Sequence, residues 1–258
     1  MDLTNSFQDR SIVPIALQKK YSFVEVRNAA AVISSSCPKE WEQVITYLKK
    51  YKLQTHELMT PGGSKSLVVA SLENLFYADG WLETRVDTEQ IVYKVSKRTG
   101  ERTPIKLTEY DTKGRLQINE VAHQVDISST FQEGYLIDAL KGRLAIDIEW
   151  NAKDGNLDRD ISAYRAWYDL GLIDGAILIT KEMNSCRNLV TKIWSDYQSQ
   201  LPKDHTDKNK KIPVDLGTTT TTSLEKARER IKRGDAGGCP ILIVGLTERC
   251  WDKQPYSR

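Results

Sequence analysis

The most informative pattern of apolar and polar positions in the chain lies between residues 134 and 150. Two short apolar runs are separated there by Lys141 and Gly142, and such a pair favours a turn. The pattern predicts two neighbouring strands, the first ending near Lys141 and the second covering Leu144 to Trp150.

Apolar and acidic residues alternate along the second of these runs. Period two places Asp147 and Glu149 on one face of the strand and Ile146 and Ile148 on the other. Two carboxylates on one face repel each other, and burial raises that cost unless a cation neutralises them. Asp138, in the preceding run, is placed to complete the cluster from the adjacent strand, and three carboxylates suit a hard divalent ion such as Mg²⁺. The alternative is that the acidic face is simply the solvent-exposed side of an edge strand.

Further patterns predict a mixed α/β chain. Phe23 to Val26 and Ile173 to Thr180 are candidate strands, and Pro38 to Lys52 carries an apolar stripe at helical spacing. Asp158 to about Leu170 is a second predicted helix, since early carboxylates suit a helix amino end, and Leu116 to Val125 is a third. The order hairpin, helix, strand fits a mixed β-sheet flanked by helices.

Two polar segments are ambiguous. Residues 86–107 read as a hairpin that turns at Lys97 to Gly100, and such an arm suits either a DNA backbone or plain solvent exposure. Pro61 to Ser66 looks superficially like a phosphate-binding loop, but it lacks the spacing of that motif, and a plain turn is the favoured interpretation.

The composition of the chain excludes some classes of protein but does not by itself indicate a function. The 258 residues suit one domain, and a net charge of +2 neither indicates nor excludes a nucleic-acid partner. The four cysteines are scattered and only three histidines are present, which disfavours a structural zinc site. We find no signal sequence and no apolar run of membrane-spanning length, so we expect a cytoplasmic protein with reduced thiols that does not engage a membrane.

The acidic motif resembles a known nuclease core. Asp138, eight further residues and then Asp147-x-Glu149 resemble the PD-(D/E)XK pattern, with Glu149 standing where a lysine is commonest. The stretch Asp147 to Asp160 is similar to the signature of BglII/BstYI/BamHI-like type II restriction endonucleases, a group whose members also lack that lysine. The resemblance covers residues 134–181, and residues 216–247 support it.

The resemblance implies a restriction-endonuclease-like α/β core and a function. We expect a single nuclease domain over residues 1–258, with the catalytic core at about 115–247 and N-terminal helices and a candidate DNA-contacting hairpin in 1–114. The implied activity is Mg²⁺-dependent hydrolysis of double-stranded DNA by a homodimer at a palindromic site, leaving 5′-phosphate and 3′-hydroxyl ends. Asp138, Asp147 and Glu149 are the implied metal ligands, and Glu120 is a further catalytic candidate on a preceding helix.

Candidate DNA contacts lie after the acidic motif. They are Lys153, the basic loop residues Lys208, Lys210 and Lys211, and the threonine-run residues Thr219, Thr220 and Thr221. Part of that run has a structural alternative, because Thr222 and Glu225 match a capping box for a helix that ends at Gly234.

Two other functions compete with restriction. A DNA-repair nuclease on the same core would select DNA structure over sequence, and a catalytically silent DNA-binding protein would keep the fold alone. The intact acidic trio disfavours the silent protein, because buried carboxylates without a task are costly.

Overall fold

The computed structural model describes residues 2–9, 12–62, 65–104, 106–108, 124–126, 129–214, 216 and 220–257. The chain forms two compact units. Residues Met1–Thr84 and Ile137–Arg258 make the first unit, and Arg85–Leu136 make the second.

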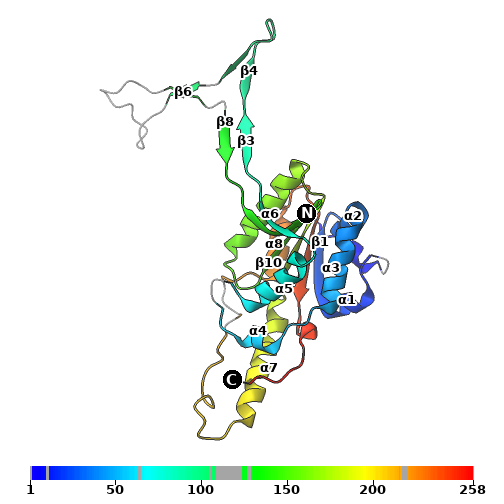
Figure 1. The fold of residues 1–258 in the computed structure, drawn as a ribbon, viewed down its shortest axis with the longest axis vertical. Coiled ribbons are helices and arrows are strands. Elements are labelled where there is room, and N and C mark those ends of the chain that lie inside the picture. The colour runs from blue at the N-terminus through cyan, green and yellow to red at the C-terminus, as the bar shows by residue number, and fades with distance from the viewer. Residues whose placement is uncertain are drawn as a thin grey trace, which may run out of the picture. The chain divides into compact units, whose positions relative to one another are not determined.

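The first unit is built on a six-stranded sheet with the strand order β1-β12-β11-β10-β9-β2 (Figure 1). β10, β11 and β12 run parallel to one another, while β1 and β9 are antiparallel to their neighbours β12 and β10. The sheet is therefore mixed. Its strands are β1 (Tyr21–Val26), β2 (Leu82–Arg85), β9 (Leu136–Lys141), β10 (Leu144–Glu149), β11 (Gly175–Lys181) and β12 (Ile241–Leu246).

Helices cover both faces of this sheet. Ile146, Ile177 and Val244 share one buried core with residues of α2, α3, α5 and α7, whereas α6 and α8 contact the strands through the opposite face. The helices of this unit, with two short 3-10 segments, are η1 (Ser6–Gln8), α1 (Ile15–Lys20), α2 (Ala29–Ser36), α3 (Pro38–Lys50), α4 (Thr55–Met59), α5 (Leu67–Tyr77), α6 (Gly155–Asp169), α7 (Met183–Gln200), α8 (Leu224–Arg233) and η2 (Glu248–Cys250). The predicted fold class, a mixed sheet flanked by helices, is confirmed, and it is consistent with the expected restriction-endonuclease-like core.

Most of the local predictions in this unit are also confirmed. The strand predicted at Phe23 to Val26 is β1, the helix predicted from Pro38 is α3, and the strand predicted at Ile173 to Thr180 is β11. The predicted helix at Asp158 is α6, which begins three residues earlier, at Gly155. The sheet draws β1 and β2 from the segment before residue 115, so residues on both sides of the expected core boundary build it.

One predicted helix cap is wrong. The N-cap of α8 is Ser223, whose hydroxyl accepts a hydrogen bond from the Lys226 amide, and not Thr222. Glu225 does not close a capping box either, because its carboxylate accepts from the amide of Met183 at the start of α7. The helix ends at Gly234 as predicted, in the left-handed conformation that glycine adopts without strain.

The second unit consists of paired short strands. They are β3 (Thr88–Ile91) with β8 (Ser129–Gln132), β4 (Tyr93–Val95) with β5 (Arg102–Pro104), and β6 (Lys106–Thr108) with β7 (Gln124–Asp126). The predicted hairpin is therefore right only around its turn. Gln90 and Ile91, expected to pair within residues 86–107, pair instead with Thr130 and Ser129.

The helix predicted at Leu116 to Val125 lies mainly outside the described residues. Its last two positions, Gln124 and Val125, belong to strand β7, so the prediction is wrong at that end.

None of the described helices is both long enough and apolar enough to cross a bilayer.

Candidate active site

The acidic motif lies where the ladder between β9 and β10 stops. Regular pairing ends at Ile146 opposite Ala139. Beyond this point the Asp138 amide donates to Asp147 Oδ1 over 2.9 Å, and the Ile148 amide donates to Asp138 Oδ2 over 2.8 Å. Each carboxylate thus takes the place of a ladder partner, which fixes the two acidic side chains against each other.

β10 is an interior strand, so the alternative of an exposed acidic face is wrong. It lies between β9 and β11, and all six of its residues are buried. As the alternation predicted, Ile146 and Ile148 belong to the main core, while Asp147 and Glu149 face helix α6. Two carboxylates are therefore held on one buried strand face.

Helix α6 supplies the partners of these carboxylates. The Tyr164 hydroxyl donates to Asp147 Oδ2 over 2.6 Å, and the Asn156 amide lies 3.5 Å from Glu149 Oε1. Arg159 pairs with Asp160 over 2.9 Å and lies 3.9 Å from Glu149. The Asp-Arg-Asp sequence of the motif therefore places one basic side chain, Arg159, and one acidic side chain, Asp160, next to Glu149.

Burial makes this cluster hold protons more tightly than free carboxyls do. It is the main cause that raises the pKa of Asp138, Asp147 and Glu149, each to about 7. Repulsion adds to it, from Asp147 on Asp138, from Asp160 on Asp147, and from Asp138 on Glu149. Burial and the nearby Glu149 likewise raise the pKa of Asp160, to about 8. A bound cation would offset the repulsion between these carboxylates and would favour their ionised forms.

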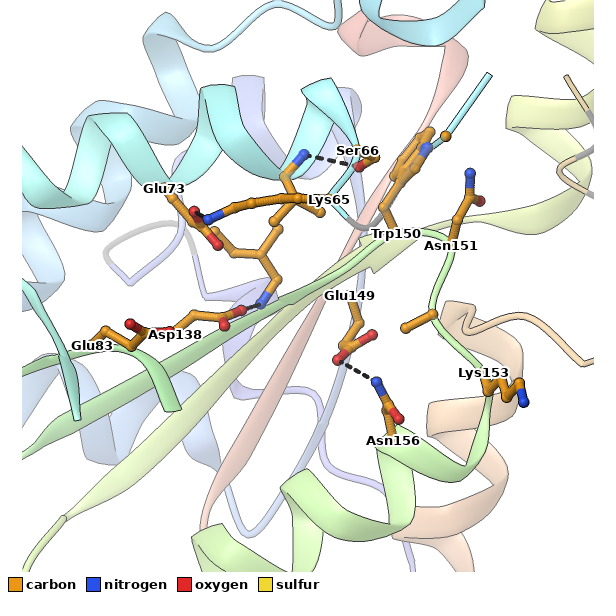
Figure 2. A pocket seen from close by; sticks show the side chains of 14 residues that line it. Lys65, Ser66, Glu73, Glu83, Asp138, Glu149, Trp150, Asn151, Lys153 and Asn156 are labelled. Atoms are coloured by element: carbon orange, nitrogen blue, oxygen red, sulfur yellow. Dashed lines mark hydrogen bonds and ion pairs between the residues drawn. The ribbon is translucent and has the colours of Figure 1, made fainter. Parts of the chain in front are cut away.

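A pocket of about 490 Å³ opens in front of part of this cluster (Figure 2). Asp138 and Glu149 line it, but Asp147 does not, because it lies behind them with 3% of its surface exposed. The remaining lining residues come from the segment that leads into α5, from α5, from β2, from β10 and the segment that follows it, and from the start of α6: Gly62, Lys65, Ser66, Val69, Glu73, Glu83, Ile148, Trp150, Asn151, Ala152, Lys153 and Asn156.

Glu73 is a residue of the candidate site that the sequence analysis missed. It lies on α5, is 3% exposed, lines the pocket and forms an ion pair with Lys65. Its charge also contributes to the raised pKa of Asp138. A lone carboxylate within an apolar helical segment was the available signal. The expected helical acid, Glu120, lies outside the described residues.

The predicted DNA contacts fall into two groups. Lys153 lines the pocket, and its backbone pairs with Thr221, while the Asp154 amide donates to the Thr220 carbonyl over 2.7 Å. The structure therefore brings Lys153, Thr220 and Thr221 together, although of the three only Lys153 lines the pocket. Thr219 lies outside the described residues.

The basic loop after α7 is not part of the pocket lining. Lys208 donates to the carbonyls of Gln198 and Leu201 over 2.7 and 3.0 Å, at the carboxyl end of α7. Lys210 pairs with Asp207 over 2.7 Å, and Lys211 is exposed. Lys208 thus has a structural task, since it satisfies carbonyls that a helix end leaves without partners.

A buried lysine ties the pocket wall to the threonine segment. Lys181 on β11 is fully buried and donates to the carbonyls of Trp150 and Thr222 and to the side chain of Asn151. Its ammonium also lies 5.4 Å from the centre of the Trp150 ring. One cation thus fixes two segments that border the same pocket.

Replacing Lys181 with methionine is expected to lower the free energy of unfolding by about 3 kcal/mol, because buried acceptors would lose a charged donor. Urea unfolding measures this, with Lys192→Met, a change at an exposed α7 residue, as the control. An unfolding free energy equal to that of the wild type would show that the contacts of Lys181 contribute little.

The donor set suits a hard divalent ion in chemical type. Carboxylate oxygens are the ligands that Mg²⁺ prefers, and the like charges of Asp138, Asp147 and Glu149 repel one another. Among the described residues, however, no three acidic, histidine or cysteine side chains are grouped closely enough to hold a metal as they stand. The carboxylates fit the ion as donors, and binding it requires them to draw together.

Comparison with known proteins gives one family. The model of the family "Restriction endonuclease BglII/BglIII" matches residues 21–246, which include every strand of the six-stranded sheet. No curated protein matches the chain.

Proposed function

Because the chain belongs to the BglII/BglIII restriction endonuclease family, we propose that the pocket formed by Asp138, Glu149 and Glu73 is its cleavage site. Members of this family are type II site-specific deoxyribonucleases, hydrolases that act on double-stranded DNA. The observation that carries the proposal is the interruption of the β9–β10 ladder by Asp138 and Asp147 at the edge of the pocket.

Asp138, Asp147 and Glu149 are the proposed ligands of Mg²⁺. When bound, the ion would act as a Lewis acid and would orient and activate a water molecule. The buried, mutually repelling carboxylates support this assignment, because a cation is what lets all of them ionise together. Glu73 is placed to support the same cluster from α5. Glu120 stays a prediction from the sequence.

Hydrolysis joins a water oxygen to the phosphorus and breaks the bond to the 3′ oxygen. The water loses one proton and the 3′ oxygen gains one, which leaves 5′-phosphate and 3′-hydroxyl ends. Glu149 is the candidate for accepting the water proton, because it lines the pocket and a carboxylate within reach of the water can serve as a general base.

DNA recognition is proposed to involve two copies of the chain. A palindromic site is read naturally by a homodimer, in which each subunit cleaves one strand. Lys153 lines the pocket, and it is proposed to contact the DNA backbone next to the scissile bond together with Thr220 and Thr221, whose segment pairs with the backbone of Lys153 and Asp154. Lys208, Lys210 and Lys211 are proposed as DNA contacts outside the pocket lining, and Thr219 stays a predicted DNA contact.

Digestion of unmethylated phage DNA tests this function. With Mg²⁺ we expect discrete fragments whose sequenced ends share one palindrome and whose 5′ ends carry phosphate. With EDTA in place of Mg²⁺ we expect intact DNA. Random nicking would contradict site-specific cleavage in favour of a repair nuclease, and DNA binding without any cutting would contradict the proposed chemistry. Light scattering would separately test the dimer.

A further inference from the structure

The pocket is rich in negative charge for a site that receives a phosphodiester. Its strand-borne ionisable residues are Asp138 and Glu149 from the core of the sheet and Glu83 from β2, and Glu73 adds a fourth carboxylate from α5. A scissile phosphate is itself an anion, and its negative charge shifts toward the leaving oxygen during cleavage. Cleavage is therefore helped by a positively charged side chain in the pocket, and this side chain has to come from a part of the chain other than these strands.

Lys65 is the cation that points into this pocket. Its ammonium pairs with Glu73, and Figure 2 shows its side chain extending over the pocket to the Glu73 carboxylate. The Glu73 side chain is 5% exposed, whereas the Lys65 side chain is 51% exposed. The lysine is therefore the member of the ion pair that a DNA ligand can reach.

The backbone around Lys65 adds to the same positive region. Ser66 is the N-cap of α5, and its hydroxyl accepts from the Val69 amide over 3.2 Å. Both residues line the pocket, so the amino end of an eleven-residue helix lies beside Lys65. Helix amino ends favour anions. The polar stretch Pro61 to Ser66 lacks a nucleotide-binding spacing, yet it places its lysine at the pocket.

Two other cations are less well placed. Lys153 lines the pocket, but in Figure 2 its side chain points away from Glu149 and Asp138. Arg159 contacts Asp160 through two of its nitrogens, at 3.0 and 2.9 Å, and is not among the lining residues. Lys65 alone of these three lines the pocket and reaches one of its carboxylates.

We propose that Lys65 is a catalytic residue whose ammonium leaves Glu73 to contact a non-bridging oxygen of the scissile phosphate and to stabilise the transition state. This assignment rests on the proposed function of the pocket. It gives the segment before α5 a direct part in cleavage, although that segment lies far from the acidic motif in sequence.

Lys65→Met tests the proposal with two measurements. In single-turnover digestion with Mg²⁺ we expect cleavage to slow by on the order of 100-fold. In metal-free binding to a plain DNA duplex, we expect the slope of log affinity against log salt to fall by about one, because one phosphate contact is lost. Lys65→Arg is expected to recover at least about 10-fold of the lost rate, since it keeps the charge.

Lys49→Met is the matched control, because Lys49 is an exposed lysine at the end of α3 and outside the pocket. It is expected to match wild type in cleavage rate and salt slope. If Lys65→Met keeps the wild-type rate, or loses rate with an unchanged salt slope, Lys65 does not contact phosphate and the inference is wrong. Failure of the wild type to cut would instead overturn the proposed function, and this inference with it.

Discussion

Asp147→Asn is expected to reduce DNA cleavage by about 1000-fold while leaving a protein that, free of metal at pH 8, unfolds less readily than the metal-free wild type. The catalytic loss corresponds to about 4 kcal/mol of transition-state stabilisation, the scale of one charged ligand at a metal-assisted site. The gain in stability follows from burial. Asp147 is 3% exposed, and an ionised carboxylate there is repelled by Asp138 and Asp160, a cost that a neutral amide does not carry.

Single-turnover digestion and urea unfolding measure the two effects on the same preparation. Asp196→Asn is the control, because Asp196 is an exposed carboxylate on α7 and neither property should change. DNA binding should persist in Asp147→Asn. If Asp147→Asn cleaves DNA within about tenfold of the wild-type rate, Asp147 is not a catalytic residue. If the variant loses both folding and cleavage, the role of Asp147 is structural.

In the metal-free protein, the free energy of unfolding is expected to fall as the pH rises from about 5 to about 8. The pKa values of Asp138, Asp147 and Glu149 are raised to about 7, from ordinary values of 3.8, 3.8 and 4.5, mainly by burial. Between these limits the folded chain holds protons that the unfolded chain has released. The stability from this difference is complete below the unfolded values and is lost as the pH passes through the folded values.

Urea unfolding in EDTA at several pH values measures this loss, which we expect to be about 2–4 kcal/mol since the three groups titrate as one coupled cluster. Asp138→Asn should flatten the pH profile. Mg²⁺ should restore stability mainly above pH 7, where the carboxylates are ionised and a cation binds the folded form best. A profile that rises with pH over this range would contradict the assigned pKa directions.

The sequence predicted the centre of the site because its geometry is local. Alternation fixes the side of β10 on which Asp147 and Glu149 lie, and a short turn brings Asp138 beside them. The same logic cannot place Glu73. Glu73 lies on α5, which contacts β10 only in the folded protein. The apolar periodicity of α5 predicts which face of the helix is buried, but it does not predict which strand that face contacts.

The second unit shows the opposite error. Gln90 and Ile91 were assigned to a hairpin because their nearest extended neighbour lay just across a turn. Strand alternation gives the faces of a strand but not its partner, so a strand from much later in the chain, β8, was equally compatible with the pattern.

The position of β1 has a consequence for how the nuclease is made. β1, from the first tenth of the chain, pairs along its whole length with β12, which ends at Leu246, and β12 in turn pairs with β11. A ribosome must therefore translate the chain through Leu246 before β11 and β1 gain the strand that lies between them. Contacts so distant in sequence form late in folding. Until β12 has been translated, the sheet that carries Asp138, Asp147 and Glu149 is incomplete, so the cleavage proposed for this site waits for that strand.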